Sequence, residues 1–307
     1  MYSDIVIFKK LDTVGDSFLV SRGFQVFHII LRFYFLRFLK IFCRVFKIYF
    51  SFLGKLLWNI DFLQLSKASI IIVFDSSIDI YFCRLLQHIY PNKKLILYYW
   101  NTIDFLKEKQ ISQFKHYWDI YSFDLNDCRK YQLKYNKLFS PIPDNFLTLE
   151  TKEIKQDVFF AGYNKGRIEQ ILEIIREFDC LGITYKIICP DINDFSNPNI
   201  ITEPLSYEEI LLEDIASKAI LDINYNDIYG MTMRELETIF LKKKLITNNC
   251  MVKDRDYYNE NNVFIIDCKT KPILKDLIEF LKKPFVPLND ELLKSYKIES
   301  WFQRFNI

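Results

Sequence analysis

The chain alternates short apolar runs with longer segments of helical periodicity, and this alternation limits the folds that are open to it. The runs are four to seven residues long, rich in β-branched and aromatic side chains, and bounded by polar turns. Strands of a parallel sheet have this pattern, because helices cover both faces of such a sheet. We therefore expect consecutive βα units. The runs are DIVIF (4–8), SIIIVF (69–74), KLILYYW (94–100), DIYSF (119–123), NKLFS (136–140), DVFFAG (157–162), TYKIIC (184–189), AILDIN (219–224), KLIT (244–247) and VFIID (263–267).

The number of runs indicates two domains, because ten strands are too many for one sheet in 307 residues. The segment SPIPDNFLTLETKEIKQ (140–156) has two prolines followed by polar residues, as a linker does. The predicted fold class is α/β, with two Rossmann-like domains whose parallel sheets face a cleft. We predict an N-terminal domain at 1–145, a C-terminal domain at 156–295 and an amphipathic C-terminal helix at 296–307.

Charge is unevenly distributed along the chain. The net charge of +2 does not fit a protein that coats nucleic acid, and we expect no nucleic-acid partner. Between Asp16 and Asp61, however, there is no acidic residue. The remainder of the chain is mildly acidic. The basic residues of this segment are Arg22, Arg32, Arg37, Lys40, Arg44, Lys47 and Lys55.

The segment 24–58 is both basic and aromatic, and we predict that it forms a long helix. Its most apolar part, 24–43, carries Arg32, Arg37 and Lys40, each of which costs about 2.5–3.5 kcal/mol at a bilayer centre. We therefore expect no membrane-spanning helix. Two interpretations remain open: a helix that packs on the N-terminal sheet with a solvated basic face, or a helix that binds an anionic membrane surface.

The number and spacing of the cysteines indicate the cell compartment in which the protein is expected. There are seven of them, scattered and without a CxxC or Cys/His spacing, which disfavours a disulfide framework and a zinc site. A reducing cytoplasm fits this usage. The stretch MYSDIVIFKK lacks the pattern of a signal peptide. We expect a cytoplasmic protein, held peripherally at the inner face of the cell membrane.

One candidate binding site is the turn in DVFFAGYNKGRIEQILEIIREF, between a predicted strand and a clear helix. Gly162 and Gly166 bracket this turn, and Lys165 and Arg167 add two cations. A helix N-terminus offers free N–H groups and a partial positive charge, which suits a diphosphate. The turn matches neither GxGxxG nor a P-loop. The alternative is an ordinary glycine turn with solvated cations.

A second candidate lies in GMTMRELETIFLKKKLITNN (230–249), where we predict a helix that begins at about Thr232. Arg234 and Glu237 are three residues apart and share a helix face. A carboxylate near a helix start can accept two ribose hydroxyls, and the arginine can bind a phosphate oxygen or fix the carboxylate. The alternative is a weak surface ion pair.

These segments together resemble GT-B glycosyltransferases. The spacing from Glu237 to Leu245 and Ile246 matches the E-A-x-x-x-x-K-P-V-I segment of that family, and FFAGYNKGR resembles its donor-phosphate loop. YYWN (98–101) and YSFDLNDCRKYQLKY (121–135) add to a likeness to bacterial capsule and lipopolysaccharide enzymes. The resemblance covers about residues 69–267. It implies a nucleotide-sugar donor, a glycan or lipid-linked acceptor and a glutamate that binds the donor ribose.

The resemblance leaves the identity of that glutamate open. Leu241, Lys242 and Lys243 stand where a small residue and glycine are usual in the family. Gly230 is seven residues before Glu237, where five is usual, and Glu235 fits that spacing instead. Either glutamate is therefore a candidate.

We expect no metal and no cofactor, because the nucleotide-sugar is a substrate. The sequence has one DxD motif, at 254–256, in a predicted loop with an arginine inside it. Asp75 and Asp79 have the wrong spacing for this motif. We predict that cations of the protein stabilise the departing diphosphate.

A catalytic base, if the reaction inverts, should follow a strand of the N-terminal domain. We prefer Asp16; Asp12, Asp75 and Asp124 also follow predicted strands and could instead be helix N-caps. Asn101 could hold an acceptor hydroxyl. The three histidines lie in helical patterns and are predicted to be packed or surface residues: His28, His88 and His116.

The predicted function is metal-independent transfer of a sugar to a surface glycan. One rival is a non-catalytic scaffold at the membrane surface with a degenerate transferase fold. A Rossmann epimerase is disfavoured, because SDIVIFKKLDTVGDSF has one glycine where three are needed.

Overall fold

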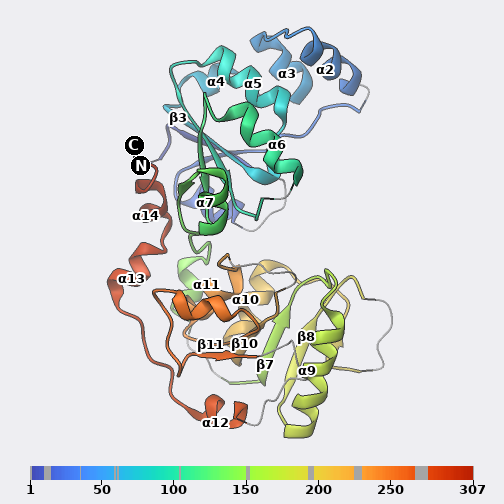
Figure 1. Ribbon diagram of the computed structural model, residues 1–307, viewed down its shortest axis with the longest axis vertical. Coiled ribbons are helices and arrows are strands. Elements are labelled where there is room, and N and C mark those ends of the chain that lie inside the picture. Colours follow the sequence, from blue (N-terminus) through green and yellow to red (C-terminus); the bar gives the residue numbers. More distant parts are fainter. Residues whose placement is uncertain are drawn as a thin grey trace. The chain divides into compact units, whose positions relative to one another are not determined.

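The computed structural model divides into two compact units, Met1–Lys137 and Leu138–Ile307. Over the described residues, each unit contains a six-stranded, all-parallel sheet flanked by helices (Figure 1). The predicted fold class, α/β with Rossmann-like domains and parallel sheets, is therefore confirmed. The described residues are 2–9, 15–34, 36–58, 60, 62–103, 105–149, 153–192, 197–224, 230–266 and 276–306.

The first unit has the strand order β2-β1-β3-β4-β5-β6. Its central strands are continuous apolar runs because both faces are covered; every residue of Ile70–Phe74 is buried. The strands are β1 (Ile5–Phe8), β2 (Gln25–Phe27), β3 (Ile70–Phe74), β4 (Lys94–Tyr99), β5 (Asp119–Ser122) and β6 (Lys134–Tyr135).

The helices of the first unit bury apolar stripes against this sheet. Alternate strand residues such as Val6, Ile71 and Leu95 share one core with Leu57 and Phe82 of two covering helices. The helical elements are α1 (Asp16–Ser21), α2 (Leu36–Val45), α3 (Ser51–Trp58), α4 (Phe62–Ser66), η1 (Asp75–Ser77), α5 (Ile80–Ile89), α6 (Phe105–Phe114) and α7 (Leu125–Tyr131).

The long helix predicted for 24–58 is wrong. The segment consists of β2, α2 and α3, with non-helical residues between them. Lys47 adopts a left-handed backbone conformation (φ 53°) just after α2, which a continuing α-helix does not allow. The basic side chains also differ in their surroundings, since Lys40 forms an ion pair of 2.7 Å with Asp79.

The second unit has the strand order β12-β11-β10-β7-β8-β9. The buried side of α9 consists of Ile171, Ile174, Ile175 and Phe178, and Gly182 ends this helix at φ 66°. The strands are β7 (Gln156–Ala161), β8 (Tyr185–Ile188), β9 (Ile200–Ile201), β10 (Ser217–Asp222), β11 (Lys244–Thr247) and β12 (Val263–Ile265). The helical elements are α8 (Asp144–Leu147), α9 (Ile168–Leu181), α10 (Tyr207–Ile215), α11 (Met233–Leu241), η2 (Cys250–Asp254), α12 (Leu277–Lys282), α13 (Asp290–Ser295) and α14 (Ile298–Gln303).

The C-terminal segment packs on the start of the second unit. Trp301 of α14 is fully buried, and its ring lies 5.0 Å from that of Phe139. The backbone N–H of Ser140 donates to the carbonyl of Tyr296. Among the described residues, no helix combines the length and the apolar character needed to cross a bilayer.

Both sheets reverse their strand order at one point. In the first unit the reversal lies between β1 and β3, and in the second between β7 and β10. Ligands of open parallel sheets bind beside such a reversal, at the carboxyl ends of the strands. The loops that follow these four strands are therefore the places to look for a site.

Candidate functional site

The N-terminus of α11 is fixed by its own side chains. Thr232 Oγ1 accepts a hydrogen bond from the Glu235 N–H (3.1 Å), and Glu235 Oε1 accepts one from the Thr232 N–H (3.2 Å). This capping box satisfies two of the N–H groups that a helix start leaves free. The Thr232 hydroxyl also donates to Asp222 Oδ2 (2.8 Å), at the end of β10. The helix start is thereby tied to the strand order reversal.

Glu235 is fully buried and faces the interior of the unit. Its second oxygen accepts a hydrogen bond from the Tyr257 hydroxyl, and Arg255 Nε lies 3.7 Å away. Burial raises the pKa of Glu235 to about 7, although Arg255 opposes this shift. The side chain therefore has a structural partner on each oxygen.

Glu237 is also fully buried, in a cluster that we call the Arg234 cluster: Arg234, Glu237 and Asp214. Arg234 Nη1 lies 2.6 Å from Glu237 Oε2 and 3.4 Å from Asp214 Oδ2 of α10. The prediction that Arg234 and Glu237 share a helix face is confirmed. Burial raises the pKa of Glu237 to about 8 and that of Asp214 to about 7, against the opposing charge of Arg234.

Because both carboxylates are buried, a donor ribose cannot reach them directly in the described conformation. Glu235 and Glu237 each have an exposed fraction of 0%, whereas Thr232 and Arg234 are partly exposed. A ribose would reach either glutamate only after the residues that cover it had moved. In the described conformation, the mixed charges at the start of α11 are explained by internal pairs, and the ribose contact stays a prediction.

Side-chain hydrogen bonds also hold the β7–α9 loop, although α9 has no capping box. Asn164 Oδ1 accepts hydrogen bonds from the backbone N–H groups of Gly166 (3.2 Å) and Ile168 (3.0 Å). Asp191, after β8, accepts the N–H of Asn164 itself (2.6 Å). Two of the N–H groups that could hold a phosphate are thus already bonded. Lys165 is exposed, with a left-handed backbone (φ 47°).

Arg167 joins this loop to the end of β10. Its Nε donates to the carbonyl of Tyr163 (3.1 Å), its Nη1 donates to the carbonyl of Ile223, and its guanidinium lies over the Phe160 ring. A Cβ on Gly162 would lie 2.5 Å from Arg167 Nη2. Gly162 therefore leaves room for this arginine, and Arg167 has a clear structural role next to the strand order reversal.

In the first unit, Asp16 lies after β1 in a group of three ionisable side chains. Its carboxylate is 2.5 Å from Lys9 Nζ and 3.5 Å from His28 Nε2. Asp16 keeps 27% of its side chain exposed, whereas Lys9 keeps 6%. Burial lowers the pKa of Lys9, and Asp16 opposes that shift. A carboxylate beside two potential cations, with access to water, has the surroundings expected of a proton acceptor.

His28 corrects the prediction that it lies in a helix. It follows the strand β2, and its Nδ1 is 2.9 Å from the carbonyl of Lys9. Because a carbonyl only accepts hydrogen bonds, Nδ1 carries a proton and Nε2 faces Asp16. The sequence pattern does not predict this placement, because β2 has only three residues and is too short to be recognised as a strand.

Asn101 and Asp75 form a second polar pair at the same sheet edge. Asn101 Nδ2 donates to Asp75 Oδ2 (3.0 Å), and the Trp100 N–H donates to Asp75 Oδ1 (3.0 Å). Asp124 is the N-cap of α7, as its alternative interpretation held, and accepts from the Asn126 N–H. The remaining alternative, Asp12, lies outside the described residues.

No metal cluster occurs within the described parts of the chain, where no group of three or more His, Cys, Asp or Glu side chains could hold an ion. In the DxD motif, Asp256 accepts a hydrogen bond from the Tyr296 hydroxyl. Metal independence remains a prediction.

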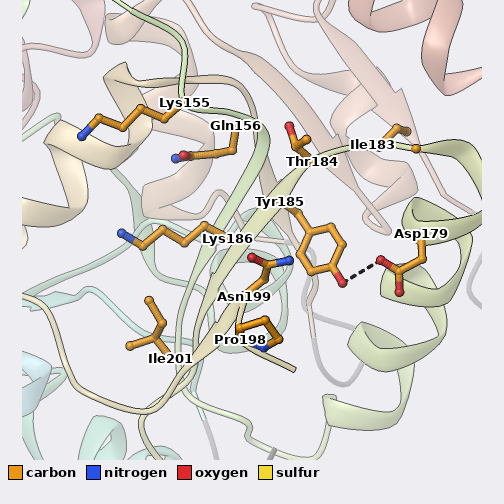
Figure 2. Close-up of a pocket in the computed structure, with 11 residues that line it drawn as sticks. Lys155, Gln156, Asp179, Ile183, Thr184, Tyr185, Lys186, Pro198, Asn199 and Ile201 are labelled. Atoms are coloured by element: carbon orange, nitrogen blue, oxygen red, sulfur yellow. Dashed lines mark hydrogen bonds between the residues drawn. The ribbon is translucent and has the colours of Figure 1, made fainter. Parts of the chain in front are cut away.

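A hollow of about 640 Å³ lies elsewhere in the second unit (Figure 2). It lies at the amino ends of β7 and β8, the edge opposite the loops described above. Two of its polar groups have protein partners: Tyr185 donates to Asp179 (2.9 Å; Figure 2), and Lys186 pairs with Glu213, which lies outside the lining (2.7 Å). These contacts leave it without a feature that indicates a ligand.

Comparison with known proteins gives structural matches and no sequence matches. No protein-family model matches the chain, and no curated protein matches it significantly. The chain is similar to the N-terminal domain of trehalose-6-phosphate phosphatase from Candida albicans, with 11% identity, 98% of this chain and 92% of that chain covered, and a TM-score of 0.50. The shared property is the fold. A match to the spinosyn forosaminyltransferase SpnP has 10% identity, 98% coverage of both chains and a TM-score of 0.48, too low to carry an argument.

Proposed function

We propose that the chain is a glycosyltransferase that moves a sugar from a nucleotide-sugar donor to a glycan of the bacterial surface, such as capsule or lipopolysaccharide. One observation carries the proposal: in both Rossmann-like units, charged side chains lie at the carboxyl ends of the strands beside the strand order reversal. In the first unit these are Lys9 and Asp16, after β1. In the second unit they are Asp222, which ends β10, and Arg167, which donates to the carbonyl of Ile223. That is the position where such sheets hold ligands. The sequence resemblance to GT-B enzymes supports the same conclusion.

The second unit would bind the donor. Lys165, Thr232 and Arg234 have exposed surface on the two loops beside the reversal. When the bond between the anomeric carbon and the diphosphate breaks, negative charge develops on the leaving oxygen, and preorganised cations stabilise it. Lys165 and Arg234 would supply this charge without a metal. Glu237 would then act as a positioning residue that holds the guanidinium of Arg234.

The first unit would bind the acceptor. As an acceptor hydroxyl oxygen attacks the anomeric carbon, its proton must leave, and Asp16 would take it if the reaction inverts the anomeric centre. The ion pair with Lys9 holds the Asp16 carboxylate in place after β1. Asn101, which Asp75 orients, would hold an acceptor hydroxyl.

The proposal includes a peripheral position at the cytoplasmic face of the membrane. A lipid-linked acceptor is held there, and cytoplasmic nucleotide-sugars reach it. The basic and aromatic segment 24–58 supports this position.

A second candidate function is a non-catalytic scaffold that retains a transferase fold. The observation that favours it is the closure of the donor edge: Glu235 and Glu237 have no exposed surface, and Asn164 caps the start of α9. A scaffold needs the fold without an open donor site.

A thermal-shift screen of the purified full chain with UDP, GDP, CMP and their sugar conjugates tests the proposal. A nucleotide at about 100 times its Kd stabilises the protein by about 2.7 kcal/mol. We expect one nucleotide to raise the Tm by about 5 °C, and the matching sugar conjugate to be hydrolysed slowly. Chelator should leave both results unchanged.

Three outcomes would contradict the proposal. The absence of any shift would exclude nucleotide binding and favour the scaffold. A shift without hydrolysis or transfer would mean that the chain binds a nucleotide without catalysis, which also favours the scaffold. Activity that chelator abolishes and manganese restores would contradict the metal-free mechanism.

A further inference from the structure

The helix α2, which Figure 1 labels in the first unit, has apolar residues on two opposite faces. Leu36 and Cys43 are buried in the core of the first unit. The opposite face is exposed to solvent, and its four residues lie within an arc of about 100°, at about 100° per residue. They are Phe38 (78% exposed), Ile41 (42%), Phe42 (52%) and Val45 (63%).

The exposed apolar residues continue after α2 and along α3. The Phe42 and Phe46 rings are 4.5 Å apart, and those of Phe50 and Phe52 are 5.9 Å apart. Single exposed apolar residues are common, but eight of them within residues 38–56 indicate a surface that binds a partner. We call it the aromatic surface: Phe38, Ile41, Phe42, Val45, Phe46, Phe50, Phe52 and Leu56.

Exposed cations accompany the aromatic surface. Arg37 and Arg44 are seven residues apart, so they lie on one side of α2, about 100° from the apolar stripe. Lys47 and Lys55 follow in the same segment and are also exposed. Lys40 differs from them because it is partly buried and paired with Asp79. We call the four exposed cations the basic rim: Arg37, Arg44, Lys47 and Lys55.

The charge of this surface selects its partner. The sequence has no acidic residue between positions 17 and 60, so a second copy that docked through the same face would bring two basic rims together. An anionic bilayer offers both kinds of group that this surface lacks, negative charges and an apolar environment. Its phosphates attract the cations, and its acyl boundary accepts apolar and aromatic side chains.

We propose that the aromatic surface docks onto an anionic lipid bilayer, with the phenylalanines at the acyl boundary and the basic rim against lipid phosphates. The inference deepens the proposed function, since it names the surface that would bring the enzyme to a lipid-linked acceptor. Vesicle binding itself requires no catalysis, so it can be tested alone.

Co-sedimentation of the full chain with vesicles tests the proposal. We expect at least tenfold stronger partitioning onto phosphatidylcholine vesicles that contain phosphatidylglycerol than onto pure phosphatidylcholine. Binding should weaken as salt is added, because the screening length falls from about 10 Å at 0.1 M to about 3 Å at 1 M.

Matched variants separate the basic rim from general charge. The rim variant R37Q/R44Q/K47Q/K55Q should partition at least about 100-fold more weakly, since each cation near an anionic surface contributes about fivefold. The control K242Q/K253Q/K283Q/K294Q removes the same charge from exposed lysines of the second unit. It should change binding less than threefold.

A second pair of variants tests the apolar part. F38Q/F42Q should lose at least tenfold in partitioning, and the residual binding should disappear at high salt. The control L63Q/L212Q replaces two leucines that are also exposed (78% and 50%) and should bind normally. Both variants should keep the unfolding temperature of the parent, because the replaced side chains lie outside the core.

Four results would overturn the proposal: no binding to either vesicle, equal binding to both, equal losses in the rim variant and its lysine control, or a lipid-free dimer that F38Q/F42Q dissociates. The last result would assign the surface to self-association. The rim variant should retain the nucleotide-induced thermal shift without vesicles, so failure of vesicle binding and failure of donor binding are distinguishable.

Discussion

The two sheets place charged residues at the same edge and surround them differently. In the first unit, Asp16 keeps 27% of its side chain exposed and His28 keeps 24%. In the second unit, Glu235 and Glu237 of α11 have no exposed surface. A carboxylate that water can reach is able to exchange a proton with a bound substrate. A carboxylate enclosed with an arginine instead holds backbone and side chains in place. The shared sheet topology therefore predicts where these acidic residues lie, but it does not predict whether they act in catalysis or in stability.

Among the predicted changes, replacement of Glu237 should have the largest effect on stability, because its side chain is enclosed in the second unit. We expect Glu237→Ala to lower the free energy of unfolding by about 3 kcal/mol, because it leaves the buried Arg234 without this partner and opens space in the Arg234 cluster. Urea unfolding measures the change. Glu173→Ala, at an exposed position of α9, should stay within about 0.5 kcal/mol. Unchanged stability with about 1–3 kcal/mol weaker nucleotide binding would instead mean that Glu237 acts at the donor site and not in the core.

The stability of the second unit should fall as the pH rises from about 5 to 8. The pKa values of Glu235, Glu237 and Asp214, about 7, 8 and 7, are raised from ordinary values of 4.5, 4.5 and 3.8. The folded state therefore binds more protons than the unfolded state in this window, and stability present at low pH is lost as the pH rises. Above pH 8 the trend should weaken, because burial lowers the pKa of Lys244 to about 8.

Urea unfolding at several pH values measures this slope. Replacement of Glu237 by Gln should flatten it, since one of the three titrating groups is removed. A slope of the opposite sign in the parent would mean that the three acids are ionised and well solvated in the folded state. The contrast between the two sheet edges would then disappear.

Asp16→Asn should lower turnover by at least about 100-fold, the usual contribution of a general base. The acidic limb of the pH–rate profile should disappear with it, because that limb reports the protonation of the base. Asp124→Asn is the matched control, since asparagine caps a helix as well as aspartate does. An Asp16→Asn enzyme with normal turnover would exclude Asp16, and His28 would be the next residue to replace.

The smallest effects should separate two cations of the β7–α9 loop. Arg167→Gln should cost about 1–3 kcal/mol of stability, because Arg167 donates to two backbone carbonyls. Lys165→Gln should leave stability unchanged and lower turnover by about tenfold, since the exposed ammonium acts only when the diphosphate departs. Equal turnover of Lys165→Gln and the parent would make this loop purely structural.

Much of the fold could be read from the sequence because parallel strands carry a local signal. Ile70–Phe74 is buried on both faces, and the apolar run predicts it directly. β2 and β9 have three and two residues, too few for any pattern. NKLFS has an apolar pattern but is not a strand; β6 lies just before it, at Lys134–Tyr135.

The segment 24–58 shows a different reason why prediction from the sequence fails. Its basic residues repeat at helical spacing, yet a left-handed lysine follows α2, and lysine gives no local signal for that conformation. The lack of acidic residues in this segment is visible in the sequence, and it supports the interpretation of the aromatic surface as a membrane-binding surface.

The candidate site depends on contacts that no local pattern carries. The pairing of Arg234 with Glu237 follows from their spacing. The burial of that pair does not, because it requires Asp214, which lies 20 residues before Arg234 on another helix. His28 reaches Asp16 only because β2 pairs in parallel with β1.

The ion pair between Lys40 and Asp79 has a mechanical consequence. Asp79 Oδ1 caps α5 by accepting the N–H groups of Tyr81 and Phe82, while its Oδ2 holds Lys40 of α2. Asp79 therefore connects α2 directly to the first turn of α5. Four residues earlier in the chain, Asp75 holds Asn101 at the edge of the sheet. A force on α2 from a bilayer would thus reach one end of the segment 75–79, whose other end orients the proposed acceptor side chain.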